Sequence, residues 1–253
     1  MFISYGHLNQ ADSVAANSIA IVPLAAMETH GPHLPFATDG LIVEGLLDRA
    51  AELDTTKTPI YCLPSLWLGA SSEHADRAGT LSVEPELLIA QIVSIGEGLA
   101  LSGVRRVLLF NAHGGNIALG NIAALKLRTE FDMLAASVHW LDFGLPEALT
   151  PPSSVQEDVH GGWMETSILL HLAPDLVKRD AAAANPPFPP AASLFPKGPV
   201  NWGWKIDDLA HGGWIGRPDL ADAALGEAMV DHAAQRLCEL LAELAAAKWP
   251  AAD

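Results

Sequence analysis

The sequence is poor in cysteine, and its two cysteines lie far apart. Cys62 and Cys238 are not spaced as a C-x-x-C motif, and neither belongs to a motif with the spacing of a zinc site. A disulfide-stapled scaffold needs several closely spaced cysteines, and structural zinc sites favour thiolate ligands. Both kinds of protein are therefore excluded, and we expect two ordinary thiols in a reducing compartment.

Basic residues are also few, and long apolar runs are missing. Lys and Arg total 14 against 30 Asp and Glu, which gives a formal net charge of −16. Nucleic-acid binding needs clustered basic side chains, so neither nucleic acid nor an anionic membrane surface is an expected partner. No apolar run reaches the ~18 residues that span a bilayer, and the first residues lack the pattern of a signal peptide. We expect a cytoplasmic protein.

Apolar runs alternate with amphipathic runs along the 253 residues. Buried strands are predicted at 18–25, 60–63, 104–110 and 133–140, and helices at 40–53, 85–101, 114 onward, 164–172 and 218–248. This alternation predicts an α/β fold, in which a largely parallel sheet is covered by helices on both faces. The length suits one large α/β domain or two small ones, and we expect a single domain over residues 1–253.

One stretch breaks the alternation. Residues 181–199 hold six prolines, which excludes regular structure. A flexible linker between domains is one interpretation. We favour a long ordered loop, because Trp202, Trp204 and Trp214 follow closely and such rings usually pack on a surface.

The first group of chemically active side chains follows the strand predicted at 18–25. Glu28 and His30 are two residues apart, so they point to the same side of an extended segment, and Asp39 begins the next predicted helix. Ligands bind outside the carboxyl ends of strands in open α/β sheets, and carboxylates with imidazole are ligands of Zn²⁺, Mn²⁺ and Fe²⁺. The alternative is a polar loop capped by Asp39.

A second group follows the strand at 104–110. His113 stands at a strand end, and Gly114 and Gly115 would let backbone N–H groups approach a ligand closely. The alternative is a glycine-rich turn with an incidental histidine.

Two further groups are less specific. His160 and Glu165 flank a glycine turn that opens a helix, and a histidine with a carboxylate suits proton transfer near neutral pH. A plain helix start would explain the same residues, because acidic groups favour the first turn. His74, in the run SSEH, could line a pocket or lie in a solvated loop.

Together these segments resemble the creatininase family, also called creatinine amidohydrolases. The run ETHGPHLPFATD at 28–39 is similar to the family's Glu-x-His-Gly-x-His-Leu-Pro signature ending in Thr-Asp. NAHGGN at 111–116 is similar to its Asn-Gly-His-Gly-Gly-Asn signature, and HGGWMETS at 160–167 to its His-Ala-Gly and Glu-Thr-Ser elements. SSEHADRAGTLS at 71–82 and GWIGRPDLADAALG at 213–226 resemble two further segments, so the resemblance covers about residues 18 to 245.

The resemblance implies a three-layer α/β/α sandwich with a dinuclear metal centre. Glu28 and His113 would bind one divalent ion, His30 the other, and Asp39 would bridge the two. Zn, Mn and Fe suit these ligands equally. A homo-oligomer, commonly a hexamer in the family, is the implied assembly.

The resemblance also implies roles for residues around the metals. A metal-bound hydroxide would attack an amide carbonyl, because a divalent ion lowers the pKa of its water and polarises the carbonyl. His160 would protonate the leaving nitrogen, while Glu165 would orient the water or complete the second metal's shell. Gly114 and Gly115 would lie near the substrate or its oxyanion.

Two further residues are candidates for substrate contact. His74 could line the pocket, and Trp163 could stack on a flat ring, although packing in the core explains that ring equally well.

One position departs from true creatininases. They carry a glutamate two residues after the histidine of the second signature, where this chain has Gly115. Family branches with Gly-Gly here include formamide deformylases and mycofactocin peptidases. We therefore expect an amidohydrolase that cleaves a small amide, cyclic amide, formamide or short peptide C–N bond, with creatinine an improbable substrate and the second metal weakly held. A mononuclear hydrolase and a non-catalytic ligand-binding member are the alternatives.

Overall fold

A single parallel sheet forms the centre of the computed structural model, which describes residues 1–12, 14–15, 17–191, 193–196 and 200–249. Within these residues the sheet has five strands in the spatial order β1-β3-β2-β4-β5. All four pairings are parallel, and β2 lies at the centre between β3 and β4. The strands are Phe2–Ser4 (β1), Ile19–Leu24 (β2), Ile60–Cys62 (β3), Arg106–Asn111 (β4) and Leu134–His139 (β5).

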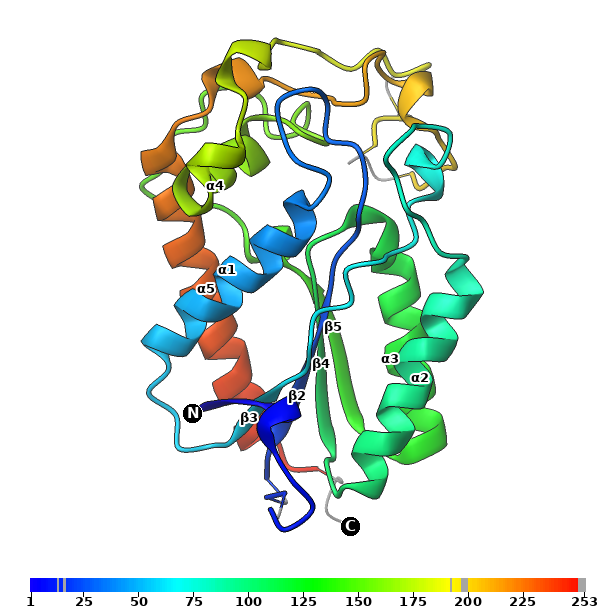
Figure 1. The fold of residues 1–253 in the computed structure, drawn as a ribbon, viewed down its shortest axis with the longest axis vertical. Helices are drawn as coiled ribbons and strands as arrows, with labels where there is room; N and C mark the ends of the chain where they lie inside the picture. The colour runs from blue at the N-terminus through cyan, green and yellow to red at the C-terminus, as the bar shows by residue number, and fades with distance from the viewer. Residues whose placement is uncertain (13, 16, 192, 197–199, 250–253) are drawn as a thin grey trace.

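Helices cover both faces of this sheet, as Figure 1 shows. On one side lie α1, α4 and α5, and on the other lie α2 and α3. Their bounds are Thr38–Leu53 (α1), Pro85–Leu101 (α2), Ile117–Phe131 (α3), Trp163–Leu172 (α4) and Ala223–Ala246 (α5). The three-layer α/β/α fold expected from the sequence is confirmed.

The central strand shows why the sequence gives three layers. All six residues of β2 are buried, and successive side chains point to opposite faces of the sheet. Ile19 and Ile21 pack in the cluster that includes α1, α4 and α5. Ala20 and Val22 pack in a second cluster with residues of α2 and α3. A continuous apolar run is therefore needed, since neither face meets water.

The predicted elements are all found, with shifted ends. The helix expected from residue 114 begins with a 3-10 turn, Gly114–Asn116, and becomes α-helical at Ile117. The helix expected over 218–248 is interrupted, because Asp222 is extended and caps α5 by accepting a hydrogen bond from the N–H of Ala224 at 2.8 Å. Strand β1 is not predicted from the sequence.

Arg106, at the start of β4, fixes the end of the C-terminal helix. Its buried guanidinium donates hydrogen bonds to the carbonyls of Leu244 and Ala247, both at 2.9 Å. Helix C-terminal carbonyls lack intrahelical donors, and a cation there also favours the helix dipole.

We expect Arg106→Ala to lower the free energy of unfolding by about 2 kcal/mol, because it removes charge-assisted hydrogen bonds from a buried site. Arg179→Ala is the control, since the Arg179 side chain is exposed. Urea unfolding of the two variants measures the difference, and equal losses would contradict the capping role.

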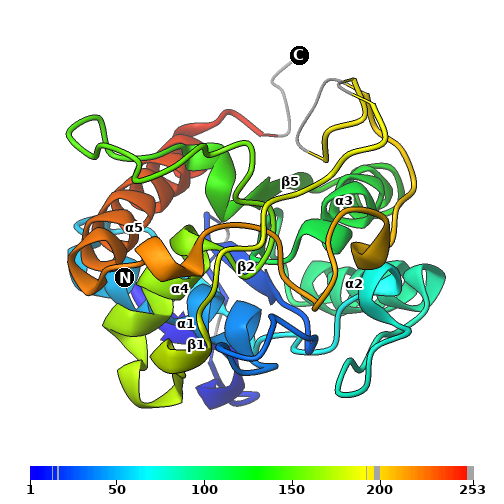
Figure 2. The ribbon, with the colours of Figure 1, turned by 90° about the horizontal axis from the view of Figure 1, so that it is seen from above.

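Long loops gather above the carboxyl ends of the strands (Figure 2). Part of the proline-rich stretch, at 192 and 197–199, lies outside the described residues. Its described part is anchored by paired backbone hydrogen bonds between Asn185 and Gly216, at 2.8 and 2.9 Å, which supports an ordered loop. Trp202 and Trp204 pack on the small cluster around Ile206, as the sequence predicts.

The described helices include none that is both long and apolar enough to cross a bilayer.

Candidate metal centre

Four segments of the chain bring polar side chains together at one end of the sheet. Glu28 and His30 follow β2, Asp39 stands in the first turn of α1, and His113 follows β4. His160 precedes α4. The carboxyl ends of parallel strands share one edge, so residues distant in the sequence meet there. The residues expected as ligands do converge, and all are buried.

The carboxylate of Asp39 lies between two imidazole rings. Its Oδ1 is 3.1 Å from Nε2 of His30, and its Oδ2 is 3.3 Å from Nδ1 of His113. Oε1 of Glu28 is 3.1 Å from the same Nδ1 of His113. One oxygen of Asp39 therefore faces each histidine, which is the arrangement that a bridging carboxylate needs.

Backbone carbonyls fix the orientation of three histidine rings. Nδ1–H of His30 donates to the carbonyl of Glu28 at 3.2 Å, and Nε2–H of His113 donates to the carbonyl of Ala70 at 3.1 Å. Nε2–H of His160 donates to the carbonyl of Thr29 at 2.6 Å. A carbonyl only accepts, so each of these nitrogens carries a proton, and the second nitrogen of each ring, which faces the carboxylates, offers a lone pair in the neutral ring.

Several buried oxygens lack a hydrogen-bond partner among the described residues. They include both carboxylate oxygens of Glu28 and Oδ2 of Asp39. Buried charged oxygens are costly unless a donor or a cation compensates them. The donor set of carboxylate oxygens and imidazole nitrogens suits a divalent transition metal, which would compensate these oxygens.

The acid–base properties of the site follow from the same contacts. Burial raises the pKa of Glu28, but the nearby His113 outweighs it and holds that pKa well below its usual value. Burial lowers the pKa of His30, yet Asp39 raises it to about 9 overall. The protein thus pairs each buried carboxylate with a positive imidazole when no other cation is present.

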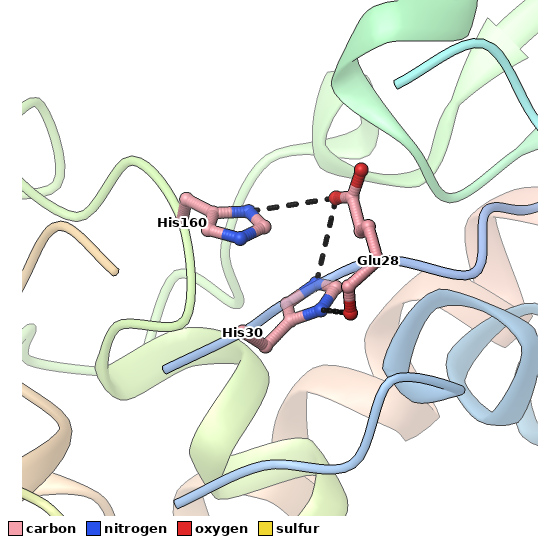
Figure 3. A group of neighbouring side chains, drawn as sticks. All are labelled: Glu28, His30 and His160. Carbon is pink, nitrogen blue, oxygen red and sulfur yellow. Dashed lines mark hydrogen bonds and ion pairs between the residues drawn. The ribbon is translucent and has the colours of Figure 1, made fainter. Parts of the chain in front are cut away.

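Side chains that could share one ion form three groups within the described part of the chain. Two contain His30: Glu28 with His30 and His160, and His30 with Asp39 and Glu165. The third consists of Glu28, Glu73 and His113. Figure 3 shows the first group, in which Nδ1 of His160 and Nε2 of His30 lie 3.7 and 3.8 Å from Oε1 of Glu28.

His160 lies in a stack of imidazole rings. Its ring centroid is 4.2 Å from that of His30 on one side and 4.1 Å from that of His74 on the other. His74 is buried, and burial together with His160 lowers its pKa to about 2, so it is neutral. His74 therefore borders the site with its ring covered by His160.

The other residues that the sequence predicts for catalysis or substrate binding differ in their position relative to the candidate metal ligands. Oε2 of Glu165 accepts a hydrogen bond from the N–H of Gly161 at 2.6 Å and lies 4.0 Å from Nε2 of His30. Gly114 is exposed, with open space where a side chain would stand. Trp163 is fully buried in the hydrophobic core, which favours packing as the role of this ring.

Three polar residues that the sequence reasoning did not single out support the site. Asn116 joins two loops, since its Oδ1 accepts from the N–H of Ala70 and its Nδ2 donates to the carbonyl of Ala25. Glu73 reaches within 3.5 Å of His113. Asp158 is buried before α4. The spacing of motif residues could have indicated Asn116, which ends the second signature.

Asp158 holds the first turn of α4 in place. Its carboxylate accepts hydrogen bonds from the N–H groups of Trp163 and Met164, at 2.6 and 3.0 Å. These two N–H groups have no acceptor within the helix, because they lie at its N-terminus. Asp158 thereby fixes the glycine turn before α4, which has His160 before it and Glu165 after it.

We expect Asp158→Ala to lower the free energy of unfolding by about 1–2 kcal/mol and to weaken metal binding, because the helix start loses its cap. Glu157→Ala, which changes an exposed neighbour, is the control. Thermal unfolding with and without added Zn²⁺ measures both effects. Matching curves for the two variants would disprove the capping role.

Comparison with known proteins identifies clear relatives. The family model described as "Creatininase: Creatinine amidohydrolase" matches residues 7–241. The chain is 32% identical over 247 residues to the mycofactocin precursor peptide peptidase of Mycobacterium tuberculosis, covering 92% of this chain and 90% of the relative. It is 30% identical over 210 residues to the creatinine amidohydrolase of Pseudomonas putida, covering 76% and 78%.

Solved structures agree. A crystal structure of creatinine amidohydrolase aligns with a TM-score of 0.78 at 26% identity and covers 98% of each chain. Related creatininase structures are described as a manganese form and, for a variant, a Zn-Zn type, with TM-scores of 0.78 and 0.73, both at 25% identity. They cover 96% and 90% of this chain, and 97% and 90% of their own.

Proposed function

Because this chain belongs to the creatininase family of hydrolases, we propose that it is a metal-dependent amidohydrolase of the branch with Gly-Gly in the second signature. Its substrate would be a small amide, a formamide or a short peptide, cleaved at a C–N bond. The centre would hold two divalent ions, with Glu28 and His113 at one, His30 at the other and Asp39 between them.

One observation carries this proposal. Both carboxylate oxygens of Glu28 and Oδ2 of Asp39 lack a hydrogen-bond partner among the residues described, and the histidine nitrogens that face these two carboxylates carry a lone pair whenever the rings are neutral. A site built only for stability would satisfy those oxygens with donors. A cation would compensate these oxygens, and it would also meet the nitrogen that each histidine ring turns toward the carboxylates.

The residues of the chain divide the chemistry between them. When bound, divalent ions would lower the pKa of a water molecule and polarise the scissile carbonyl. His160 would receive a proton on Nδ1 and deliver it to the leaving nitrogen. Its Nε2–H stays bonded to the carbonyl of Thr29, so the ring keeps its orientation.

Glu165 and the glycine turn support two further roles. The Glu165 carboxylate, 4.0 Å from Nε2 of His30, would orient the water or complete the second ion's ligands. Gly114 leaves open space beside His113, which would let a substrate carbonyl approach the backbone. His74 would close the site on the far side of His160 and support that ring rather than touch substrate.

Position 115 and the relatives together indicate the class of substrate. A side chain at 115 would strike the carbonyl oxygen of Ala70, which a Cβ would approach to 2.4 Å. Glycine is therefore built into this site, and creatinine turnover is not expected. The peptidase relative favours a short peptide as substrate. By the same family argument, we propose a homo-oligomer, a hexamer as the expected form.

The experiment that tests this function measures metal and turnover together. The chain is purified without chelator, assayed for Zn, Mn and Fe, and reloaded with each. Creatinine, N-formylated amines and short peptides are then offered, and release of amine is followed. About two ions per chain with cleavage of one class supports the proposal. About one ion indicates a mononuclear hydrolase. No binding even after reloading would leave a non-catalytic ligand-binding protein.

A further inference from the structure

Glu73 is an acidic side chain at the centre that the proposed mechanism does not use. It belongs to the 3-10 turn Ser72–His74, which follows β3. Its Oε1 lies 3.5 Å from Nε2 of His113, and its side chain is 18% exposed. Its carboxylate also lies near that of Glu28, with ligand atoms within 4.8 Å of each other, and two acidic groups this close are unfavourable without a compensating cation.

The space that Glu73 fills exists because residue 115 is glycine. A Cβ at position 115 would lie 2.7 Å from Oε1 of Glu73 and 2.5 Å from Nε2 of His113. Real Cβ atoms do not approach so closely. The Glu73 carboxylate therefore occupies space beside residue 115 that is open because this residue is glycine, and it would have to move if residue 115 carried a side chain.

Hydrogen bonds hold the segment around Glu73 in this position. The N–H of Ala70 donates to Oδ1 of Asn116 at 3.1 Å, which ties the segment to the second signature. The N–H of Ser71 donates to the hydroxyl of Ser82 at 2.9 Å. The carbonyl of Ala70 in turn accepts from His113. Glu73 and His113 are thus positioned by one connected network.

Acidic side chains lie near both proposed ion positions, the one at His30 and the one at His113. His30, Asp39 and Glu165 form one group that could hold an ion, and Glu28, Glu73 and His113 form the other. Glu165, in the first turn of α4, lies beside Nε2 of His30. Glu73 lies beside the Nε2 edge of the His113 ring, next to the Nδ1 edge that faces Glu28 and Asp39. Within each group the ligand atoms lie within 4.8 Å of one another.

Resting on the proposed dinuclear function, we infer that Glu73 is a ligand of the ion held by Glu28 and His113, in space left open by Gly115. The inference gives that ion two carboxylates and an imidazole from three separate loops, besides the bridging Asp39. It also gives Gly115 a role in this chain, which is to admit the carboxylate of another residue.

The test compares metal binding by the full chain and by Glu73→Gln. Zn²⁺ affinities come from competition with a chromophoric chelator, and the visible absorption of bound Co²⁺ reports the ligands. We expect one of two Zn²⁺ equivalents to bind at least about 10-fold more weakly in Glu73→Gln, with an altered Co²⁺ spectrum. Glu97→Gln, which removes one charge from an exposed position on α2, should match the parent.

Unfolding temperatures separate ligation from a merely structural role. Without metal, Glu73→Gln should be at least as stable as the parent, because it removes a negative charge beside Glu28. The increase in Tm on adding Zn²⁺ should be smaller than in the parent, because the variant binds the ion less tightly. A metal-free variant that is less stable, with an unchanged Zn²⁺ response, would mean a structural role and overturn the inference.

The outcomes also separate this inference from the proposed function. Two Zn²⁺ equivalents of unchanged affinity and an unchanged Co²⁺ spectrum in Glu73→Gln would overturn the ligand assignment alone. Weakened binding in the variant, with no amide cleaved by the parent, would support the assignment and reject the hydrolase. A parent that binds no metal would overturn both.

Discussion

Asp39→Ala should remove both metal ions and reduce amide cleavage by at least about 10³-fold. Asp39 places one oxygen 3.1 Å from His30 and the other 3.3 Å from His113, so a single truncation affects both positions. Without the Asp39 carboxylate, each position loses a ligand, and the repulsion between two nearby cations is no longer offset by its negative charge, so neither ion is held well. Elemental analysis after gel filtration, with the amine-release assay, measures the two losses.

Asp48→Ala is the matched control for this prediction. Asp48 lies on the same helix, α1, but is exposed. It should keep its metal and its turnover. If Asp39→Ala retained one full equivalent of metal, the bridging role would be wrong, and Asp39 would belong to one ion only.

Gly226→Ala should destabilise the fold by about 3 kcal/mol, because it forces two helices apart. Gly226 lies near the start of α5, where the helix crosses α4. A Cβ there would lie 1.9 Å from the carbonyl oxygen of Ser167 and 2.5 Å from its carbonyl carbon. Both are backbone atoms, so no side-chain rotation can relieve the overlap. The loss exceeds the gain of about 1 kcal/mol that alanine brings to a helix.

Gly98→Ala measures the stabilisation that alanine brings to a helix in the absence of any steric overlap. Gly98 lies in α2, and nothing stands within 4 Å of a Cβ built there. This variant should be more stable than the parent by about 0.5–1 kcal/mol. Urea unfolding of the two variants gives changes of opposite sign. A neutral or stabilising Gly226→Ala would show that α4 and α5 can separate at little cost.

Local patterns were enough to predict most of the fold and the core of the site. Strand β2 is fully buried on both faces, so its apolar run was visible without any tertiary information. Glu28, His30, Asp39 and His113 each stand at the end of a predicted strand or the start of a helix. Their convergence followed from the geometry of parallel sheets.

The features that sequence reasoning missed depend on contacts between distant segments. Strand β1 is three residues long and exists because it pairs with β3. Glu73 reaches His113 only because position 115, remote in sequence, carries no side chain. The sequence left substrate contact and core packing open for Trp163, and its ring packs into the core. Periodicity reports none of these contacts.

The candidate ligands come from separate loops, and all of them lie at one end of the sheet. A bound cation would therefore act as a removable cross-link between segments that the strands leave independent at that end. Removing it should loosen the turns at 70–74 and 158–162 and leave the opposite end of β2 and β4 unchanged. Amide hydrogen exchange would then rise in those turns and not in the strand centres, because local opening does not require global unfolding. The backbone itself would report whether the metal is present, independently of any substrate.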